Sequence, residues 1–385
     1  MIHIQKTSVH PYLNTELRRA WQLGQGGFAI FDIETTGLAA SHHCVYAISL
    51  LGFDSDRNEG LLHYLQIEAL DEEAQLLATA HQLMNDFPVL ISYNGAAFDL
   101  PFLEKRCRKL RLPLSFSPKH HVDVYRQLFP YRHSLFPGGM KQVQLEESLG
   151  HLRSEFIGGG EVIEYFFIYL QTRSQAAFDH LFRHNTDDVY GLTVLLQYGY
   201  LFHLQDPLFW SDSVGFRLNR QEEQNLCTFT AEQLPFHASL ALSWTLPFSP
   251  DSGLAPATLT LSRQQLTLSL PLQQNSLYYF FDDYRNYDYL PEEDMAIHRS
   301  LSCFVDKQHR RRATKSTAYT KKSDTFVPLV TIPPQDVPLF YHHYQSEPPM
   351  LKWAALDEYP DLTAEMVAGY IKKILLSGTP VKTPL

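Results

Sequence analysis

The pattern of hydrophobic and polar positions divides the chain into two halves of different character. In the first half, short apolar segments alternate with longer segments whose apolar residues recur at helical spacing. They predict strands at 28–34, 45–53, 61–67, 89–93 and up to Asp123, and helices at 71–86, 98–110, 142–149, 162–171 and 175–197. Three strands in an antiparallel meander followed by parallel strands and helices predict a mixed α/β sheet whose parallel part is flanked by helices.

The second half consists mainly of short alternating segments rich in Leu, Ser, Thr and Pro. The segments 257–261 and 266–270 predict a β-hairpin, and 363–376 predicts a final amphipathic helix. We therefore expect a mixed α/β domain at 1–204 and a β-rich α+β domain at 205–385.

Composition narrows the classes of function. No apolar segment approaches the roughly 20 residues that a membrane helix needs, so we expect a cytoplasmic protein without membrane contact. The four cysteines lie far apart, which favours neither a zinc site nor a disulfide framework. The net charge of -10 argues against nucleic-acid binding over the whole surface. Any such contact is expected to be local, through metal ions or a basic patch.

The first strand ends in two acidic side chains on one face. Asp32 and Glu34 are two positions apart, and such side chains point to the same side of a sheet. Because neighbouring carboxylates repel each other, a buried pair normally needs a cation, and their oxygens suit Mg²⁺ or Mn²⁺. The alternative is a strand end exposed to water. The Thr-Thr-Gly turn at 35–37 favours a site, because its glycine lets a backbone come close to a nucleotide.

A third acidic side chain lies where the fourth strand meets its helix. Asp99 falls in the first turn of the helix at 98–110, after Asn94-Gly95, and α/β sheets bind ligands at such junctions. Taken alone, Asp99 could simply interact with the helix dipole, and Asn94-Gly95 could be an ordinary turn.

A histidine and an acid are spaced by one helical turn in the segment 175–197. His184 and Asp188 lie on one helix face. Histidine suits a general base, and Asp188 can bind a metal ion that lowers the pKa of an attacking water. A surface contact explains the pair equally well in isolation. The combination of three acidic motifs, in order and on the expected elements, favours a catalytic site.

Together the motifs resemble the DEDD superfamily of 3′-5′ exonucleases. The matching segments are DIETTG at 32–37, YNGAAFDLPFL at 93–103 and HNTDDV at 184–189. Within that superfamily, the segments at 141–150 and 158–161 and the His-Asn-x-x-Asp end are similar to the YprB-type RNase H-like domain. The resemblance covers residues 28–198 and implies an RNase H-like sheet.

The resemblance also implies the metal ligands. They would be Asp32, Glu34, Asp99 and Asp188, holding two Mg²⁺ or Mn²⁺ ions, with His184 as general base. The usual histidine subclass has four residues between His and the last Asp, whereas this chain has three, which is the spacing of the tyrosine subclass. We expect Asp188 as the ligand and Asp187 on the exposed side of the helix.

A two-ion mechanism gives each acid a role. Two ions about 3.5–4 Å apart can stabilise the attacking and leaving oxygens of phosphodiester hydrolysis. In this interpretation Asp32 bridges the ions, Glu34 and Asp188 serve the nucleophilic water, and Asp99 supports the leaving-group ion. Leu38 and Phe98 could instead be core residues. The candidate substrate contacts are Thr35, Thr36, Gly37, Leu38, Asn94, Phe98 and Lys141.

The second half contains a basic stretch between Asp306 and Asp324 without an acid. It could follow a nucleic-acid backbone, with an aromatic residue for stacking, or be a solvated charged loop. Its basic residues are Lys307, Arg310, Arg311, Arg312, Lys315, Lys321 and Lys322, of which we take Lys307, Arg310, Arg311, Arg312 and Lys315 as candidate contacts.

Three functions remain open on the sequence alone. The leading hypothesis is a 3′-5′ exonuclease that acts on a DNA or RNA 3′ end, with DNA slightly favoured. The alternatives are a structure-selective endonuclease with the same metal site and a non-catalytic nucleic-acid-binding module. The presence of all four acids argues against the last of these.

Overall fold

The computed structural model of the protein divides into two compact units. It describes residues 1–9, 15–54, 59–153, 158–211, 218–223, 225–232, 234, 238–334 and 336–381. Unit 1 comprises Met1–Arg132 and Phe136–His203, and unit 2 comprises His133–Leu135 and Leu204–Leu385. Across the described residues, every helix is too short or too polar to span a membrane.

Unit 1 is built on a six-stranded mixed sheet with the order β1-β4-β3-β2-β5-β6. The first four strands in this order are antiparallel, and β2, β5 and β6 run parallel. The sheet confirms the predicted meander and its parallel extension. Its strands are β1 (Ile2–Val9), β2 (Phe28–Thr35), β3 (Val45–Phe53), β4 (Glu59–Gln66), β5 (Val89–Ser92) and β6 (His120–Asp123).

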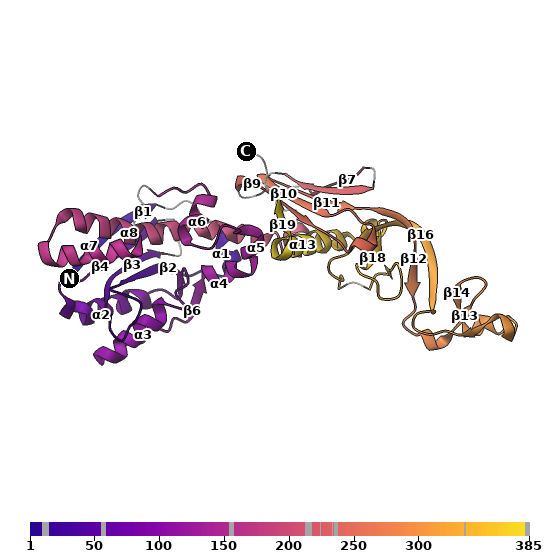
Figure 1. Ribbon diagram of the computed structural model, residues 1–385, viewed down its shortest axis with the longest axis horizontal. Helices are drawn as coiled ribbons and strands as arrows, with labels where there is room; N and C mark the ends of the chain where they lie inside the picture. Colours follow the sequence, from indigo (N-terminus) through magenta and orange to yellow (C-terminus); the bar gives the residue numbers. More distant parts are fainter. Residues whose placement is uncertain are drawn as a thin grey trace. The chain divides into compact units, whose positions relative to one another are not determined.

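Helices cover both faces of this sheet, with α7 and α8 on one face and α2 and α3 on the other (Figure 1). All nine residues of β3 are buried, in accord with a sequence that is apolar except for Ser49. The helices of unit 1 are α1 (Thr15–Ala20), α2 (Glu73–Asn85), α3 (Asp99–Leu110), α4 (Val124–Leu128), α6 (Gln142–Ser148), α7 (Gly159–Thr172), α8 (Gln175–Leu195) and α9 (Gly199–His203).

The core of unit 1 lies between the sheet and these helices. Tyr46 of β3 stacks on Phe166 of α7, with 4.1 Å between ring centroids, and Tyr64 of β4 meets Phe182 of α8 edge to face. These contacts fix α7 and α8 on the face of β2 from which Asp32 and Glu34 project.

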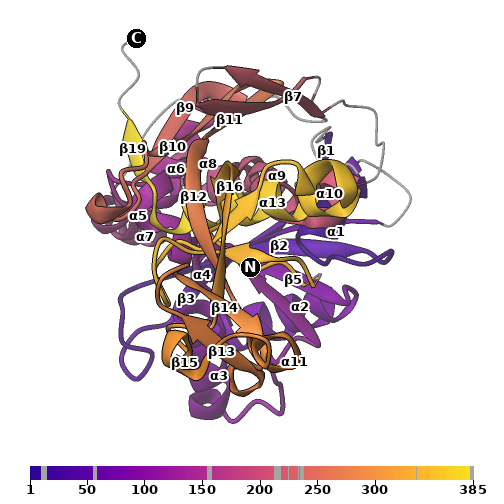
Figure 2. The same cartoon turned by 90° about the vertical axis from the view of Figure 1, so that its right-hand side faces the viewer.

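Unit 2 contains a six-stranded antiparallel sheet with the order β19-β9-β10-β11-β8-β7. The predicted hairpin is confirmed, because Leu261 of β10 pairs with Leu266 of β11. Figure 2 shows α13, the predicted final helix, beside this sheet, and it contacts β9. The elements are β7 (Leu218–Glu223), β8 (Leu226–Ala231), β9 (Ala238–Leu246), β10 (Ala257–Arg263), β11 (Gln265–Pro271), β19 (Thr379–Val381), α5 (Arg132–Leu135), α10 (Pro207–Ser211), α12 (Ala355–Glu358) and α13 (Pro360–Ser377).

Two smaller sheets complete unit 2. A four-stranded sheet has the order β12-β16-β18-β17, and its long β12–β16 ladder leads to a three-stranded sheet with the order β14-β13-β15 (Figure 1). The basic stretch belongs to the three-stranded sheet and the end of this ladder. The elements are β12 (Gln273–Phe280), β13 (Tyr287–Leu290), β14 (Met295–His298), β15 (Arg311–Arg312), β16 (Tyr319–Pro328), β17 (Leu339–Phe340), β18 (Met350–Lys352) and α11 (Arg299–Ser302).

Candidate active site

Strand β2 presents Asp32 and Glu34 on one face of the sheet. Its eight residues are buried except for these two, which are partly exposed. Asp32 pairs with Ser49 and Glu34 with Ala47 across β3, and the register shifts after Glu34. Such a bulge re-aims the end of a strand. The two acids therefore face the same space at the carboxyl end of β2.

Asp99 is brought to this space by the turn between β5 and α3. It is the first residue of α3 and is buried, and its Oδ1 accepts a hydrogen bond from the backbone N–H of Ile33 at 3.3 Å. This bond ties Asp99 to the residue between Asp32 and Glu34. The second motif is thereby attached directly to the first.

The turn itself depends on a glycine and on an acid from the neighbouring strand. Asn94 adopts a left-handed φ of 63°, and a Cβ added at Gly95 would lie 2.3 Å from Ser92 Oγ. Asp123, at the end of β6, accepts hydrogen bonds from the backbone N–H groups of Asn94 and Ala96, each at 3.0 Å. The sequence carries no signal for this role of Asp123, which holds the second motif in place.

Helix α8 supplies the third motif. His184 Nε2 lies 3.2 Å from Glu34 Oε1 and 3.5 Å from Asp188 Oδ2. One ligand atom from each of Glu34, His184 and Asp188 falls within 4.8 Å of the others. These side chains expose between 15% and 19% of their surface, so the group is open to water but partly shielded from it.

Burial and uncompensated negative charge together determine the electrostatics of the site. Burial and the charges of Asp188, Asp99 and Glu34 raise the pKa of Asp32 well above its usual value, and Arg153 offsets this only in part. Burial raises the pKa of Asp99 to about 7, against hydrogen bonds from backbone N–H groups that lower it. Carboxylates in this state gain from a nearby cation.

The same negative charges also raise the pKa of His184, where they favour the charged form. Burial alone would lower the pKa of its imidazole, but the hydrogen bond to Glu34 and the charge of Asp188 outweigh burial and raise it. A histidine with this environment is suited to accept and hold a proton beside the carboxylates.

The donor set fits a divalent cation with oxygen ligands. Four carboxylates meet at one end of the sheet, and burial together with their mutual repulsion raises the pKa of Asp32. The buried hydroxyl of Ser49, the cross-strand neighbour of Asp32, has no hydrogen-bond partner among the described residues. Hard oxygen donors with excess negative charge suit Mg²⁺ or Mn²⁺ better than a soft metal.

An arginine also reaches the site, and the sequence analysis missed it. Arg153 Nη1 donates to Asp188 Oδ1 at 2.7 Å, and its Nη2 and Nε donate to the two carboxylate oxygens of Glu146 at 2.6 and 2.7 Å. Glu146 is fully buried and lies on α6. No spacing rule connects these residues, because the ion pairs span 7 and 35 positions of the chain.

The prediction that Asp187 lies on the exposed side of the helix is wrong. Asp187 is half-buried, and burial raises the pKa of its carboxyl. The reason is the packing of α8, which is covered by α6 and the sheet as well as by α7.

Some of the candidate substrate contacts already make hydrogen bonds or core contacts within the protein, and others do not. Thr35 Oγ1 donates to the Gly37 carbonyl at 3.0 Å, and Thr36 Oγ1 accepts from the Cys44 N–H at 3.0 Å, so both hydroxyls already stabilise the turn. Phe98 packs against the core of unit 1 and meets the ring of Phe102. Leu38, Asn94 and Lys141 remain open to a ligand, since Asn94 is partly exposed, Lys141 is exposed, and Leu38 exposes 86% of its surface.

The basic stretch in unit 2 is partly neutralised by its own surroundings. Arg310 and Arg312 form ion pairs with the two carboxylate oxygens of the buried Asp288, at 3.2 and 3.4 Å. Lys321 pairs with Asp294. Three basic residues are exposed and carry no ion pair within the described residues: Lys307, Arg311 and Lys315. The guanidinium of Arg311 lies over the Tyr289 ring.

Tyr319 in this stretch and Phe304 just before it differ in exposure. Tyr319 is buried and donates a hydrogen bond to Asp294, which removes it from any stacking surface. Phe304 exposes 88% of its surface. The part of the stretch that can meet a nucleic acid is therefore smaller than its sequence indicates.

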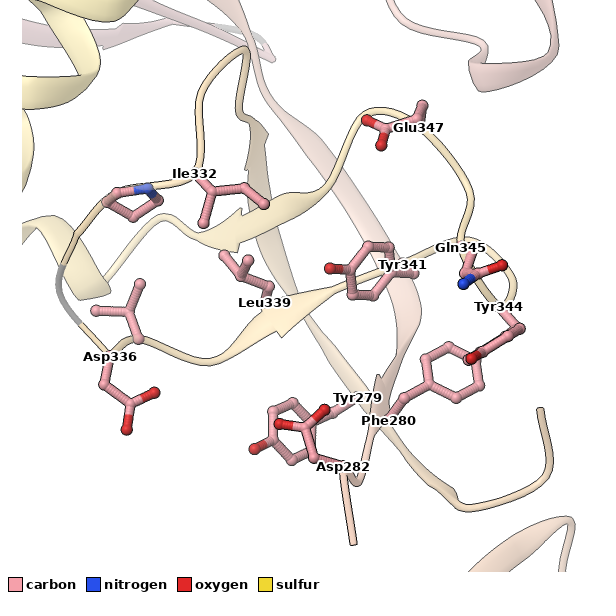
Figure 3. A pocket seen from close by; sticks show the side chains of 12 residues that line it. Tyr279, Phe280, Asp282, Ile332, Asp336, Leu339, Tyr341, Tyr344, Gln345 and Glu347 are labelled. Carbon is pink, nitrogen blue, oxygen red and sulfur yellow. The ribbon is translucent and has the colours of Figure 1, made fainter. Parts of the chain in front are cut away.

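Unit 2 also contains a groove of about 580 Å³ with a different character (Figure 3). Its lining residues include three acids and no Lys, Arg or His. After burial, the negative charges of Glu347 and Asp282 help to raise the pKa of Tyr341. The groove is therefore unsuited to a phosphate backbone. The aromatic and acidic lining residues are Tyr279, Phe280, Tyr341, Tyr344, Asp282, Asp336 and Glu347.

Comparison with known proteins indicates the fold family of most of unit 1. Residues 29–200 match the sequence model of RNase_H_2, described as RNase_H superfamily. These residues form an RNase H-like domain, which confirms the fold class predicted for this half of the chain. The match is consistent with the resemblance carried by the three motifs.

Proteins whose sequences are similar to part of this chain include DNA polymerases. The chain is 26% identical to DNA polymerase 1 of Sulfolobus acidocaldarius over 117 residues and 28% identical to DNA polymerase 1 of Aeropyrum pernix over 109 residues. These alignments cover 26% and 25% of this chain, but only 13% and 11% of the polymerases.

Solved structures give weaker likenesses. The family B DNA polymerase of Pyrobaculum calidifontis aligns with a TM-score of 0.41 and 14% identity, over 91% of this chain and 46% of the polymerase. A zinc-bound complex of E. coli ExoI with single-stranded DNA aligns with a TM-score of 0.28 and 14% identity, over 57% of this chain and 54% of ExoI.

Proposed function

We propose that this protein is a divalent-metal-dependent 3′-5′ exonuclease that hydrolyses phosphodiester bonds of DNA or RNA. The observation that supports this most directly is the convergence of Asp32, Glu34, Asp99 and Asp188 from one strand and two helices, with His184 between two of them. The RNase H-like fold of residues 29–200 supports the same class of reaction.

The four carboxylates would hold the two Mg²⁺ or Mn²⁺ ions. When bound, the ions would lower the pKa of a water and stabilise the charge that develops on the attacking and leaving oxygens. The fold holds these carboxylates in fixed positions. Ile33 N–H fixes Asp99 beside β2, and the rigid sheet fixes the spacing of Asp32 and Glu34.

His184 would take the proton from the attacking water. Its Nε2 lies between Glu34 and Asp188, both of which stabilise the imidazolium that forms. A general base in such a position contributes roughly 10²–10⁴-fold to the rate.

The nucleotide at the 3′ end would lie over the turn after β2. Leu38 is exposed there and can contact a base. Asn94 and Phe98 border the site from the β5–α3 turn, and Lys141 offers a cation to a phosphate. DNA is the favoured substrate, because the relatives that match are named DNA polymerases.

A ladder assay tests the proposal. A 5′-labelled single-stranded DNA in Mg²⁺ should shorten one nucleotide at a time from the 3′ end, a circular DNA of the same sequence should stay intact, and a matched RNA should shorten more slowly. Cleavage of the circle would instead establish an endonuclease. Binding without hydrolysis in Mg²⁺ or Mn²⁺ would favour a non-catalytic module.

Two substitutions connect the activity to the site. Asp32→Asn or Asp188→Asn should abolish hydrolysis while the fold survives, because each removes a ligand and relieves repulsion in the metal-free protein. Asp179→Asn, which changes an exposed acid on the same helix as Asp188, is the matched control and should keep full activity. Near-parental activity of either site variant would rule out this site.

A further inference from the structure

The Glu146–Arg153 pair lies directly behind Asp188. The Arg153 side chain exposes 7% of its surface and Glu146 none, and the guanidinium binds both carboxylate oxygens of Glu146. A buried carboxylate needs such a partner, and a bidentate guanidinium supplies the strongest one. The pair is therefore neutral as a unit, and Arg153 is not simply the counter-ion of Asp188.

Packing holds the pair against α8. A Cβ added at Gly191 would lie 1.9 Å from Glu146 Oε1, so the carboxylate occupies space that only a glycine leaves open. Gln142 Nε2 donates both to Glu146 Oε1 at 2.9 Å and to the Asp188 carbonyl at 2.7 Å. Gln142 thus connects the Glu146 carboxylate to the backbone of α8 at Asp188.

The two carboxylate oxygens of Asp188 have different partners. Oδ1 accepts the hydrogen bond from Arg153 Nη1 at 2.7 Å, whereas Oδ2 lies 3.5 Å from His184 Nε2, on the side where Glu34 also lies. Arg153 thereby occupies one oxygen and leaves the other facing the carboxylates of β2. A carboxylate held in this way offers a single oxygen in a fixed direction.

We propose that Arg153, anchored by Glu146, is a positioning residue that fixes Asp188 as a one-oxygen metal ligand. The inference rests on the proposed metal-dependent function, which it deepens by adding two residues that act through Asp188. Partners behind a metal ligand orient it, and their removal typically weakens metal binding roughly 10–100-fold.

The chain contains a matched control for this pair. Arg106 and Glu73 form a second buried bidentate pair in unit 1, with side chains 7% and 3% exposed. Their remaining hydrogen bonds join the Val45 N–H and the Ala40 carbonyl, not a site carboxylate. Replacing either pair by apolar residues removes one positive and one negative charge, so the net charge of the protein is unchanged.

The experiment compares Mn²⁺ affinity by isothermal titration calorimetry in the full-length parent, Glu146→Leu/Arg153→Met and Glu73→Leu/Arg106→Met. A buried pair can often be replaced by apolar residues without loss of stability, and thermal unfolding confirms that each variant is folded. The Glu146/Arg153 variant should bind Mn²⁺ roughly 10–100-fold more weakly, while the Glu73/Arg106 variant should bind as the parent does.

Equal Mn²⁺ affinity in the parent and the Glu146/Arg153 variant would overturn the inference, as would equal weakening in both paired variants. If the Glu146/Arg153 variant does not fold, Arg153→Lys decides the question, because lysine keeps the charge but loses the fork that reaches both carboxylates. Parental affinity of that variant would overturn the inference too. DNA hydrolysis by the parent is measured separately, so failure of the positioning role and failure of the nuclease proposal give different results.

Discussion

The acidic site of unit 1 and the basic stretch of unit 2 are both clusters of like charge, but their surroundings treat them differently. The carboxylates of Asp32, Glu34 and Asp99 have no ion pair with Lys or Arg among the described residues, and Asp188 has only Arg153, which Glu146 already balances. In the basic stretch, Arg310, Arg312 and Lys321 are each paired with an acid of unit 2.

This difference indicates which cluster is built to bind something. Like charges that stay uncompensated cost stability, which is justified when a ligand of opposite charge is to be bound. Charges that are paired within the fold mainly stabilise it. Asp288 is a buried carboxylate that needs Arg310, so much of the basic stretch is explained without nucleic acid. Lys307, Arg311 and Lys315 are the residues for which a ligand remains the better explanation.

Apart from the loss of a metal ligand, the largest effect is expected at His184, the proposed general base beside the acidic cluster. His184→Ala should lower turnover roughly 10²–10⁴-fold and flatten the acid limb of the pH–rate profile, because the limb reports deprotonation of the base. His184→Gln keeps a hydrogen-bonding side chain without a titrating group and should be as slow as His184→Ala. Steady-state rates from pH 5 to 9 test this. A glutamine variant that regains most of the rate, or an unchanged pH profile, would make His184 a positioning residue instead.

An intermediate effect, on nucleic-acid binding, is expected for the residues of the basic stretch that form no ion pair. Changing Lys307, Arg311 and Lys315 together to Gln should weaken binding of long single-stranded DNA and reduce the slope of log K against log salt by up to about 2, at roughly 0.7 per phosphate contact. Binding is measured between 50 and 200 mM salt by fluorescence anisotropy. Turnover at saturating substrate should barely change.

Two further variants sharpen the same comparison. Arg310→Gln should lower the thermal stability of unit 2, because it leaves the buried Asp288 without the closer of its two arginine partners. Changing the exposed Lys105, Arg108 and Arg111 on and after α3 to Gln removes the same charge elsewhere and should leave the salt slope unchanged. An unaltered slope in the Lys307/Arg311/Lys315 variant would identify these candidate contacts as solvated or structural surface.

The smallest effect concerns the stability cost of the acidic cluster. Because the folded-state pKa of Asp99 is about 7 and its unfolded value is near 4, the folded protein binds a proton that the unfolded chain releases between these values. The contribution of Asp99 to stability therefore falls as pH rises through this window. In metal-free buffer, Asp99→Asn should melt roughly 2–4 °C above the parent at pH 8, as about 1 kcal/mol would give, and close to it at pH 5.

The control for this pH effect is Asp179→Asn, whose acid is exposed on α8. Its melting temperature should follow that of the parent at both pH values. A parent protein whose stability relative to Asp99→Asn does not change between pH 5 and 8 would show that the charged form of Asp99 is not destabilised by burial and its neighbours.

The fold of unit 1 could be predicted because its local patterns agree with its tertiary structure. The strands and long helices have the expected period, and the three motifs fall on the expected elements. No strand was predicted at Ile2–Val9, because its apolar alternation ends after Ile2 and Ile4. The strand forms through edge pairing with β4, where Ile2 lies opposite Gln66. Such pairing leaves no local signal.

The site could be predicted only where its residues carry their own motif. Asp32, Glu34 and His184 are recognisable by spacing, whereas Glu146 and Arg153 become meaningful only when α6 packs on Gly191. Asp123 supports Asn94 across parallel strands, again without a signal along the chain. The supporting residues depend on tertiary contacts and were missed for that reason. The same cause explains why the pairing of Arg310 with Asp288 was not foreseen.

The central claim, that the four carboxylates hold divalent ions at a nucleic-acid 3′ end, is tested most directly by crystallography. Crystals grown with Mn²⁺ and a short phosphorothioate DNA should give two anomalous peaks about 3.5–4 Å apart, contacted by Asp32, Glu34, Asp99 and Asp188, with the 3′-terminal phosphodiester against them. Full-occupancy DNA with no Mn²⁺ peak at these carboxylates, or with its 5′ end at the site, would contradict the account.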